Sequence, residues 1–243
     1  MDAVVFALGF GVIAFAVAAV ATRADRRLTL ASALLFAVYL ALDDLVTGLP
    51  SAVPALDFLP GDWNWEGKFF SIALAFGVIA IFGLSRDAVG LTLRQRNLKS
   101  SLVVAALYLP WAAALGLMFK PGLSAETLAF QATMPGIAEE LALRGVAPAL
   151  LLGLLRGKPG VVGVPWAVVA VSGILFGVWH ALGYSDGAFS FDLTSALLTG
   201  FGGLVACWLR FNSGSLLLPV LLHGAANVLF HLVPWVVAAP QIG

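Results

Sequence analysis

Long apolar runs constrain this chain more than any other feature of its sequence. An α-helix rises 1.5 Å per residue, so about 20 apolar residues cross the hydrocarbon core of a bilayer. Hydrophobic residues make up 61% of the 243 residues and charged residues only 11%, which excludes an ordinary soluble domain. We therefore predict an all-α, polytopic membrane helix bundle of about eight transmembrane helices, with spans near residues 3–22, 28–45, 69–84, 101–119, 125–155, 161–180, 193–209 and 215–237.

The remaining composition excludes several other classes of protein. The chain has 13 basic and 13 acidic residues, and this balance gives no reason to expect a nucleic-acid partner. Its one cysteine, Cys207, excludes an intrachain disulfide and a cysteine-based zinc site. Asp2 before the first apolar run and Arg23 after it favour a retained span over a cleaved signal peptide.

We expect one integral membrane domain over residues 1–243. Residues 1–100 carry no motif, Asp43 and Asp44 are interpreted as interfacial, and the proline-rich residues 47–68 are predicted to form a loop on the membrane surface. Basic residues follow every second span, which places both termini outside by the positive-inside rule. The Ala-, Gly- and Val-rich composition, with few lysines, favours a prokaryotic plasma membrane.

The first polar motif lies inside the fifth apolar run. A charge at the centre of a membrane helix costs about 2.5–3.5 kcal/mol, so Glu139, Glu140 and Arg144 need partners or a wet cavity. Glu140 and Arg144 are spaced i, i+4 and are predicted to form an ion pair, for which simple anchoring of one helix to another is the alternative explanation. The side chain of Glu139 points about 100° around the helix axis from that of Glu140. We expect it to be unpaired and to face a cavity, beside a break or bend at Pro135–Gly136 and another at Pro148.

Two further motifs lie in the sixth and eighth runs. Phe176 and His180 are spaced i, i+4, so the aromatic ring is predicted to wall a site around the histidine, although a lone histidine at a helix end is often a cap. His223, Asn227 and His231 form a polar stripe at successive i+4 steps. Such a stripe faces the protein interior, where interhelical hydrogen bonding is the alternative explanation.

Taken together, Glu-Glu-x-x-x-Arg, Phe-x-x-x-His and His-x-x-x-Asn occur in that order on three late membrane segments. This pattern resembles the CAAX protease and bacteriocin-processing (CPBP) family, which includes the type II CAAX prenyl endopeptidases. The resemblance spans roughly residues 100–235 and implies a catalytic core over residues 101–240. It implies an intramembrane protease whose substrate is a peptide or a membrane protein.

The resemblance also implies roles for the motif residues. Glu139, desolvated by burial, is predicted to be the general base that deprotonates water, assisted by His180. His223 and Asn227 are predicted to stabilise the oxyanion. Glu140 and Arg144 are predicted to hold the site, Phe176 to wall it, and His231, outside the family motif, to line the cavity mouth or relay protons.

Three alternatives remain open from the sequence. A zinc-dependent version of the protease would use Glu139, His180 and His223 as ligands, whereas a metal-independent glutamate enzyme needs no cofactor. A transporter would line a proton or solute path with the same groups. A degenerate family member would act as an immunity or regulatory protein. The sequence does not name the substrate, and both prenylated and bacteriocin-type peptides are compatible with it.

Overall fold

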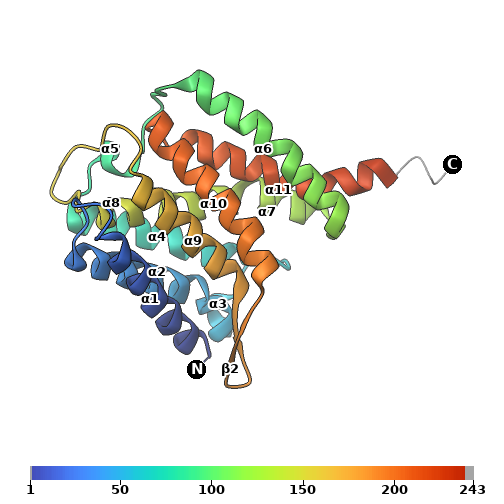
Figure 1. Cartoon of the computed structure of the whole chain (residues 1–243). Helices are drawn as coiled ribbons and strands as arrows, with labels where there is room; N and C mark the ends of the chain where they lie inside the picture. The colour runs from blue at the N-terminus through green and yellow to red at the C-terminus, as the bar shows by residue number, and fades with distance from the viewer. Residues whose placement is uncertain (1, 239–243) are drawn as a thin grey trace.

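The protein is a bundle of helices with one small β-hairpin (Figure 1). The structure, a computed structural model, describes residues 2–238. Six of its helices are long and apolar enough to cross a membrane: α1 (Asp2–Ala21), α2 (Leu30–Thr47), α4 (Trp65–Phe82), α6 (Leu98–Phe119), α10 (Leu193–Ser213) and α11 (Leu217–Ala238). The predicted all-α membrane bundle is therefore confirmed as a fold class.

The other elements are shorter. They are α3 (Leu49–Ala52), a 3₁₀ turn (Pro54–Leu56), α5 (Arg86–Val89), α7 (Ala125–Glu140), a π-helix (Leu141–Val146), α8 (Ala147–Leu151), α9 (Trp166–Ala181), β1 (Leu182–Ser185) and β2 (Ala188–Phe191). Two of the eight expected spans thus take another form. The sixth is the 16-residue helix α9, and the fifth is divided among α7, the π-helix and α8.

The irregularity in the fifth run is not where the sequence predicted it. Helix α7 continues through Pro135 and Gly136, and the hydrogen-bonding pattern changes at Leu141 instead. Gly136 serves close packing, because a Cβ added to it would lie 2.8 Å from the carbonyl oxygen of Val220 on α11. The π-helix begins directly after Glu140, and such single-turn insertions occur often at functional sites. Pro148 does not break the run either, since it lies in the first turn of α8.

Small residues bring the helices around the motifs close together. A Cβ on Gly224 of α11 would lie 2.5 Å from the carbonyl oxygen of Ala132 on α7. Gly177 of α9 faces Gly200 of α10, whose Cα would lie 3.0 Å from a Cβ on Gly177. Glycine at such crossings lets helix backbones approach, which is how membrane helices gain packing energy without a strong hydrophobic drive.

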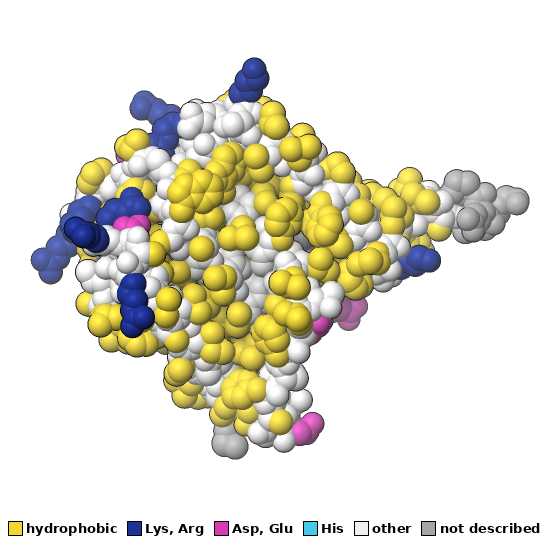
Figure 2. Space-filling model, viewed as in Figure 1, with side chains coloured by type: hydrophobic (Ala, Val, Ile, Leu, Met, Phe, Trp, Pro, Cys, Tyr) yellow, Lys and Arg dark blue, Asp and Glu magenta, His cyan; other side chains and the backbone are white. Residues whose placement is uncertain are grey.

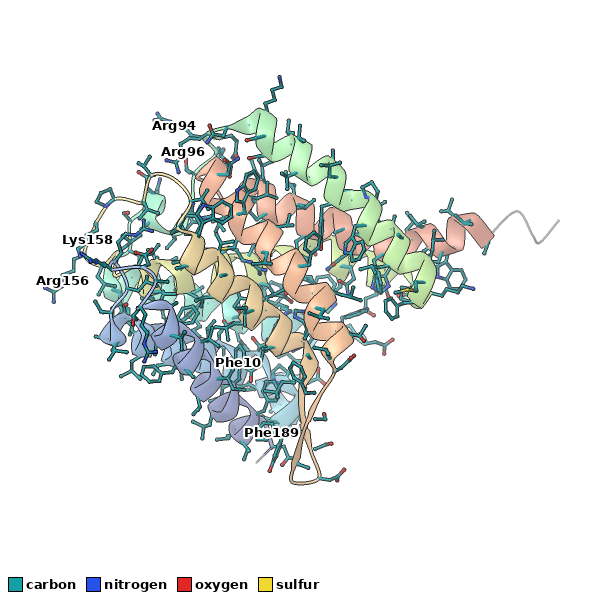
Figure 3. The ribbon with its side chains drawn as sticks, in the orientation of Figure 1. Phe10, Arg94, Arg96, Arg156, Lys158 and Phe189 are labelled. Carbon is teal, nitrogen blue, oxygen red and sulfur yellow. The ribbon has the colours of Figure 1, made fainter. Side chains whose placement is uncertain are left out.

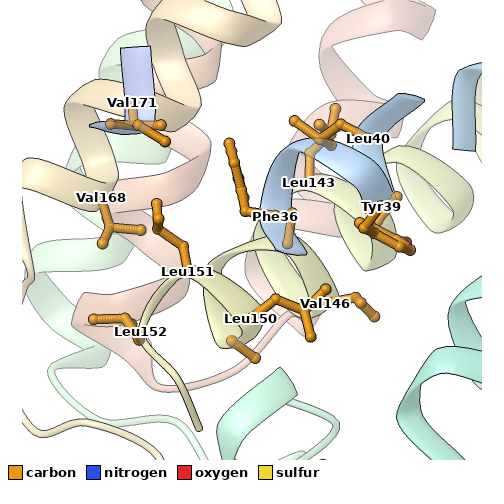
Figure 4. Close-up of a cluster of buried hydrophobic side chains, with 14 of the residues drawn as sticks. Phe36, Tyr39, Leu40, Leu143, Val146, Leu150, Leu151, Leu152, Val168 and Val171 are labelled. Atoms are coloured by element: carbon orange, nitrogen blue, oxygen red, sulfur yellow. The ribbon is translucent and has the colours of Figure 1, made fainter. Parts of the chain in front are cut away.

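The largest apolar core lies on the other side of these helices. Phe36 and Leu40 of α2 pack in one buried cluster with Val146, Leu150 and residues of α9 (Figure 4). This cluster fixes the π-helix and α8 against the N-terminal helices, because buried side chains close-pack at nearly crystalline density. The N-terminal part is thus packed against the part that carries the motifs.

The β-hairpin was not predicted. Strands β1 and β2 pair antiparallel from Leu182–Phe191 to Ser185–Ala188 directly after His180, where the sequence indicated only a polar boundary. Its turn contains Asp186 and Gly187, both with positive φ, as a tight hairpin turn requires. Phe189 of β2 reaches the N-terminal helix, and its ring would lie 2.7 Å from a Cβ on Gly9 (Figure 3).

Candidate active site

A cavity of about 580 Å³ lies between the helices that carry the motifs. Its walls come from α4, α6, α7, the π-helix, α9, α10 and α11, with the end of α2 and the residues before α4. Every residue that the sequence singled out lines it: Glu139, Glu140, Arg144, Phe176, His180, His223, Asn227 and His231. Glu139 and His231, 92 positions apart in sequence, thus face one volume, which lies within the usual range of ligand sites.

Glu140 lies at the centre of a buried charged cluster. Its Oε1 is 3.2 Å from Nη1 of Arg144, and both side chains are fully buried, as the i, i+4 spacing predicted. The same oxygen is 2.8 Å from Nδ1 of His223 on α11, a contact the sequence did not indicate. An ionised carboxylate only accepts hydrogen bonds, so His223 carries its proton on Nδ1 and donates it to Glu140. Glu140 therefore orients the histidine as well as pairing with the arginine.

Phe176 packs against three of the polar groups. The guanidinium carbon of Arg144 lies 4.1 Å from the centroid of its ring, within the range of a cation–π contact. The rings of His180 and His223 lie 4.3 Å and 6.1 Å from the same ring, the latter edge to face. The aromatic wall expected from the Phe-x-x-x-His spacing is present, and it contacts the arginine as well as the histidine.

Glu139 has a partner, contrary to the expectation that it would be unpaired. Nζ of Lys68, in the first turn of α4, donates a hydrogen bond of 2.7 Å to its Oε1. Lys68 is 8% exposed and Glu139 is 9% exposed, so the ion pair is buried. A buried carboxylate needs such a partner because desolvation disfavours an isolated charge.

The second oxygen of Glu139, Oε2, is buried. Among residues 2–238, Oε2 has no hydrogen-bond partner. Nε2 of His223 on α11 lies 3.9 Å from it, too far for a direct hydrogen bond. Two atoms at this separation can both contact a single water oxygen at about 2.8 Å.

His180 and Asn227 lie on other walls of the cavity. Nδ1 of His180 is 2.9 Å from the carbonyl oxygen of Phe176, and a carbonyl only accepts, so Nδ1 is protonated and Nε2 remains free. The amide nitrogen of Asn227 donates to Oε1 of Gln131 at 2.8 Å. Gln131, on α7, is a cavity residue that the sequence analysis missed.

His231 lies farther along α11, at an end of the cavity formed by loops. Its Nδ1 is 2.9 Å from the carbonyl oxygen of Gly122, between α6 and α7. Its ring meets Trp63 edge to face at 6.3 Å, and Trp63 stacks on Phe130 at 4.9 Å. The sequence placed His231 at the cavity mouth, and the structure places it in the wall formed with these loop residues.

The N-terminal helices add a layer of polar groups behind the site. Asp43 and Asp44, interpreted from sequence as interfacial, are partly buried and bonded inside the bundle. Oδ1 of Asp43 accepts a 2.7 Å hydrogen bond from the hydroxyl of Ser71, and Oδ1 of Asp44 accepts one of 2.7 Å from Nε1 of Trp179. The Trp179 ring lies 5.4 Å from Nζ of Lys68. Residues 1–100 therefore contribute directly to the site, although they hold no family motif.

The side chains that would serve as zinc ligands do not fit a metal site. In the described part of the chain, no three His, Cys, Asp or Glu side chains are grouped closely enough to hold a metal ion. The ammonium of Lys68 occupies one oxygen of Glu139. A cation beside a would-be ligand repels a divalent ion, and we assign no chemical step to a metal.

The part of the chain that carries the three motifs is similar to a known protein family. Residues 121–229 match a family model described as type II CAAX prenyl endopeptidase Rce1-like. This segment is similar to that family. The resemblance drawn from the motifs is thereby confirmed for a segment that runs from the start of α7 into α11. No curated protein and no solved structure matches the chain.

The Rce1-like segment contains all three motifs but leaves part of the cavity outside it. Lys68, Trp63 and His231 line the cavity from positions before or after residues 121–229. The segment implies a protease that works on a membrane-associated peptide. The N-terminal helices complete its cavity with residues that belong to no recognised motif.

Proposed function

We propose that the protein is an intramembrane endopeptidase in which Glu139 activates a water molecule for attack on a peptide bond. One observation carries the proposal: Oε2 of Glu139 and Nε2 of His223 lie 3.9 Å apart in the cavity wall, with Oε2 unpaired in the described residues. A water between them donates one hydrogen to each atom. Its lone pairs are then free to attack a carbonyl carbon.

The bond changes follow from this arrangement. The water oxygen bonds to the carbonyl carbon while its proton moves to Oε2 of Glu139. The tetrahedral intermediate then expels the amine, which takes that proton from the glutamic acid as the C–N bond breaks. The carboxylate is restored, so each turnover consumes one water and needs no other reactant.

The neighbouring groups divide the remaining tasks. Asn227 supplies an amide N–H for the developing oxyanion, and such a donor contributes roughly 3–4 kcal/mol in related chemistry. The contact between Glu140 and Nδ1 of His223 supports a water-orienting role for His223, in place of the oxyanion role expected from the sequence. His180, held through Nδ1 by the carbonyl of Phe176, assists the proton transfer that Glu139 carries out.

The substrate is a polypeptide segment that enters an apolar, membrane-level cavity. Trp63, Phe130 and Phe230 line the cavity and offer aromatic surface to apolar side chains or to a lipid group. The name of the matching family indicates prenylated peptides ending in a CAAX sequence. A bacteriocin-type precursor is the other substrate class, and the cavity accommodates apolar residues of either.

Lys68 is proposed as a positioning residue for Glu139. Replacing it by methionine, which keeps the chain length, should lower kcat at least about tenfold with little change in KM, because the base loses its fixed orientation. Lys68→Arg should restore most of kcat, since the guanidinium still donates to Oε1. Steady-state kinetics of both variants test this, and equal loss in both, or a change confined to KM, would contradict it.

Metal removal should leave activity unchanged. We expect incubation with a chelator, followed by assay in chelator, to give the same kcat as the untreated enzyme, because the proposed steps use only side chains and water. The measurement is the cleavage rate before and after treatment and after added zinc. Inhibition by chelator that zinc reverses would establish the metal-dependent alternative.

The activity itself is testable with purified, reconstituted protein. A library of soluble, lipidated and membrane-anchored peptides is incubated with the protein in liposomes, and products are identified by mass spectrometry. We expect paired fragments whose masses sum to the substrate plus one water. Movement of protons or solutes without any cleavage would support a transporter and contradict the proposal.

A further inference from the structure

The exposed charges of this protein are divided between its two ends. Nine exposed basic residues lie in the loops and short helices at one end of the bundle: Arg23, Arg26, Arg27, Arg86, Arg94, Arg96, Lys99, Arg156 and Lys158. Figure 2 shows Lys and Arg gathered on one side, and Figure 3 labels four of these residues there. Asp25 and Asp87 are the only acidic residues in those segments.

Backbone hydrogen bonds show that these loops share one end. Arg156 N donates to the carbonyl of Phe82 at the end of α4 at 2.9 Å, and Arg96 N donates to that of Ser213 at the end of α10 at 2.7 Å. Leu216, just before α11, donates to Gly90 at 2.9 Å. The ends of α4, α8 and α10 and the start of α11 thus meet at this basic end.

The opposite end is acidic. Its exposed charged residues in the described part of the chain are Asp2, Asp57, Asp62, Asp186 and Asp192, with Lys120 as the one exposed cation. These residues lie at the start of α1, before α4, in the hairpin and at the end of α6. In Figure 2 the acidic side chains lie mainly on the side away from the basic cluster.

The proposed active site lies toward the acidic end. Its cavity is lined by Thr47 at the end of α2, by Trp63 and Asn64 before α4, and by His180 next to the hairpin. None of the nine exposed basic residues lines it. The site is thus nearer to one surface of the bundle than to the other.

A second hollow lies next to the cavity at that end of the bundle. It measures about 290 Å³, shares Thr47 and Asn64 with the cavity, and is also lined by Asp2, Gly48 and Tyr184. Asp2 is the first described residue of α1, and Tyr184 belongs to the hairpin. Nδ2 of Asn64 donates a 2.8 Å hydrogen bond to the carbonyl oxygen of Thr47, so these two shared residues stand between the cavity and the second hollow at the acidic end.

We infer that the site opens on the side of the membrane away from the cytoplasm and cleaves polypeptide segments presented there. Short loops rich in Lys and Arg remain in the cytoplasm, and the nine exposed basic residues follow that rule from three separate connections between helices. The substrate class this selects is an exported or membrane-anchored polypeptide with its scissile bond near the outer surface. That the protein cleaves these segments rests on the proposed function. The side of the membrane on which the site opens is inferred from the charges and the geometry.

The side can be tested without any enzymatic activity. Ser185→Cys places a thiol in the hairpin, and Ala24→Cys places one in the basic loop between α1 and α2; both native residues are exposed. Neither change alters a charge, and the native Cys207 is buried, so the unmodified protein is the background control. Each variant is labelled in intact cells with a membrane-impermeant maleimide, before and after permeabilisation.

We expect Ser185→Cys to be labelled in intact cells and Ala24→Cys only after permeabilisation. The reverse pattern, or equal labelling of both in intact cells, would overturn the inference. A second arm uses sealed right-side-out vesicles and an impermeant peptide that the detergent-solubilised enzyme cleaves, and external peptide should be cut. If no peptide is ever cleaved, the proposed function fails while the labelling still decides the side.

Discussion

Glu139→Gln is expected to lower kcat by about 10²- to 10⁴-fold, the usual contribution of a general base. The amide keeps the size of the side chain and still accepts the hydrogen bond from Lys68 through its oxygen, so the bundle should remain folded. It lacks the basicity to take a proton from water. The measurement is kcat on the best substrate of the peptide library, together with the thermal unfolding midpoint of the same preparation.

Asp25→Asn is the matched control for this loss. Asp25 lies in the loop between α1 and α2 and pairs with exposed Arg27, so the same carboxylate-to-amide change there should leave kcat unchanged. A Glu139→Gln protein that is folded and cuts at the wild-type rate would remove Glu139 from the mechanism.

Arg144→Met is expected to destabilise the protein by about 3–5 kcal/mol, the range seen when one partner of a buried ion pair is removed. Glu140 is 0% exposed and would remain charged among apolar side chains with only His223 as partner. The contact between the guanidinium and the Phe176 ring, now 4.1 Å, would also be lost. Thermal or denaturant unfolding in detergent measures the change.

Arg27→Met gives the comparison. Arg27 forms an ion pair of 2.5 Å with Asp25, but its side chain is 49% exposed, so its loss should cost less than about 1 kcal/mol. The double change Glu140→Leu with Arg144→Met should recover part of the stability, because no buried charge is left unpaired. Equal costs for the two single arginine variants would contradict the architectural role of Arg144.

The helical bundle was predictable because apolar runs of span length leave few other folds. The apolar runs did not indicate how a long run is divided into separate helical segments. Residues 125–155 are longer than one span needs, and the irregularity in this run is the π-helix at Leu141–Val146 instead of a bend at Pro135. Prolines inside membrane helices are tolerated where neighbouring helices cover the freed backbone, so proline was a poor guide to the break.

The motif residues were predicted to share a cavity, and they do, because helical spacing fixes which side chains share a face. Contacts between different helices were harder to predict from the sequence. The pairing of Glu140 with His223 joins residues 83 positions apart, and that of Lys68 with Glu139 joins residues 71 apart. One signal for Lys68 was present in the sequence. A lysine in the first turn of an apolar helix needs an acid, and Glu139 was an acid without a partner.

The hairpin was missed for a different reason. Residues 182–191 contain the turn residues Asp186 and Gly187 between two short segments, but each segment has only four residues. Strands this short give little alternation to detect, and an isolated hairpin is stable only when it packs on something else. Here that support is α1, which Phe189 reaches near Gly9, and no local pattern reports such a contact.

The central claim, that Glu139 and His223 hold the attacking water, is tested most directly by an experimental structure at a resolution that shows ordered waters. The account predicts a water within about 2.6–3.2 Å of both Oε2 of Glu139 and Nε2 of His223, with Nζ of Lys68 still bonded to Oε1. A metal ion bound by Glu139, His180 and His223 would contradict it, as would Glu139 and His223 lying too far apart to share one water.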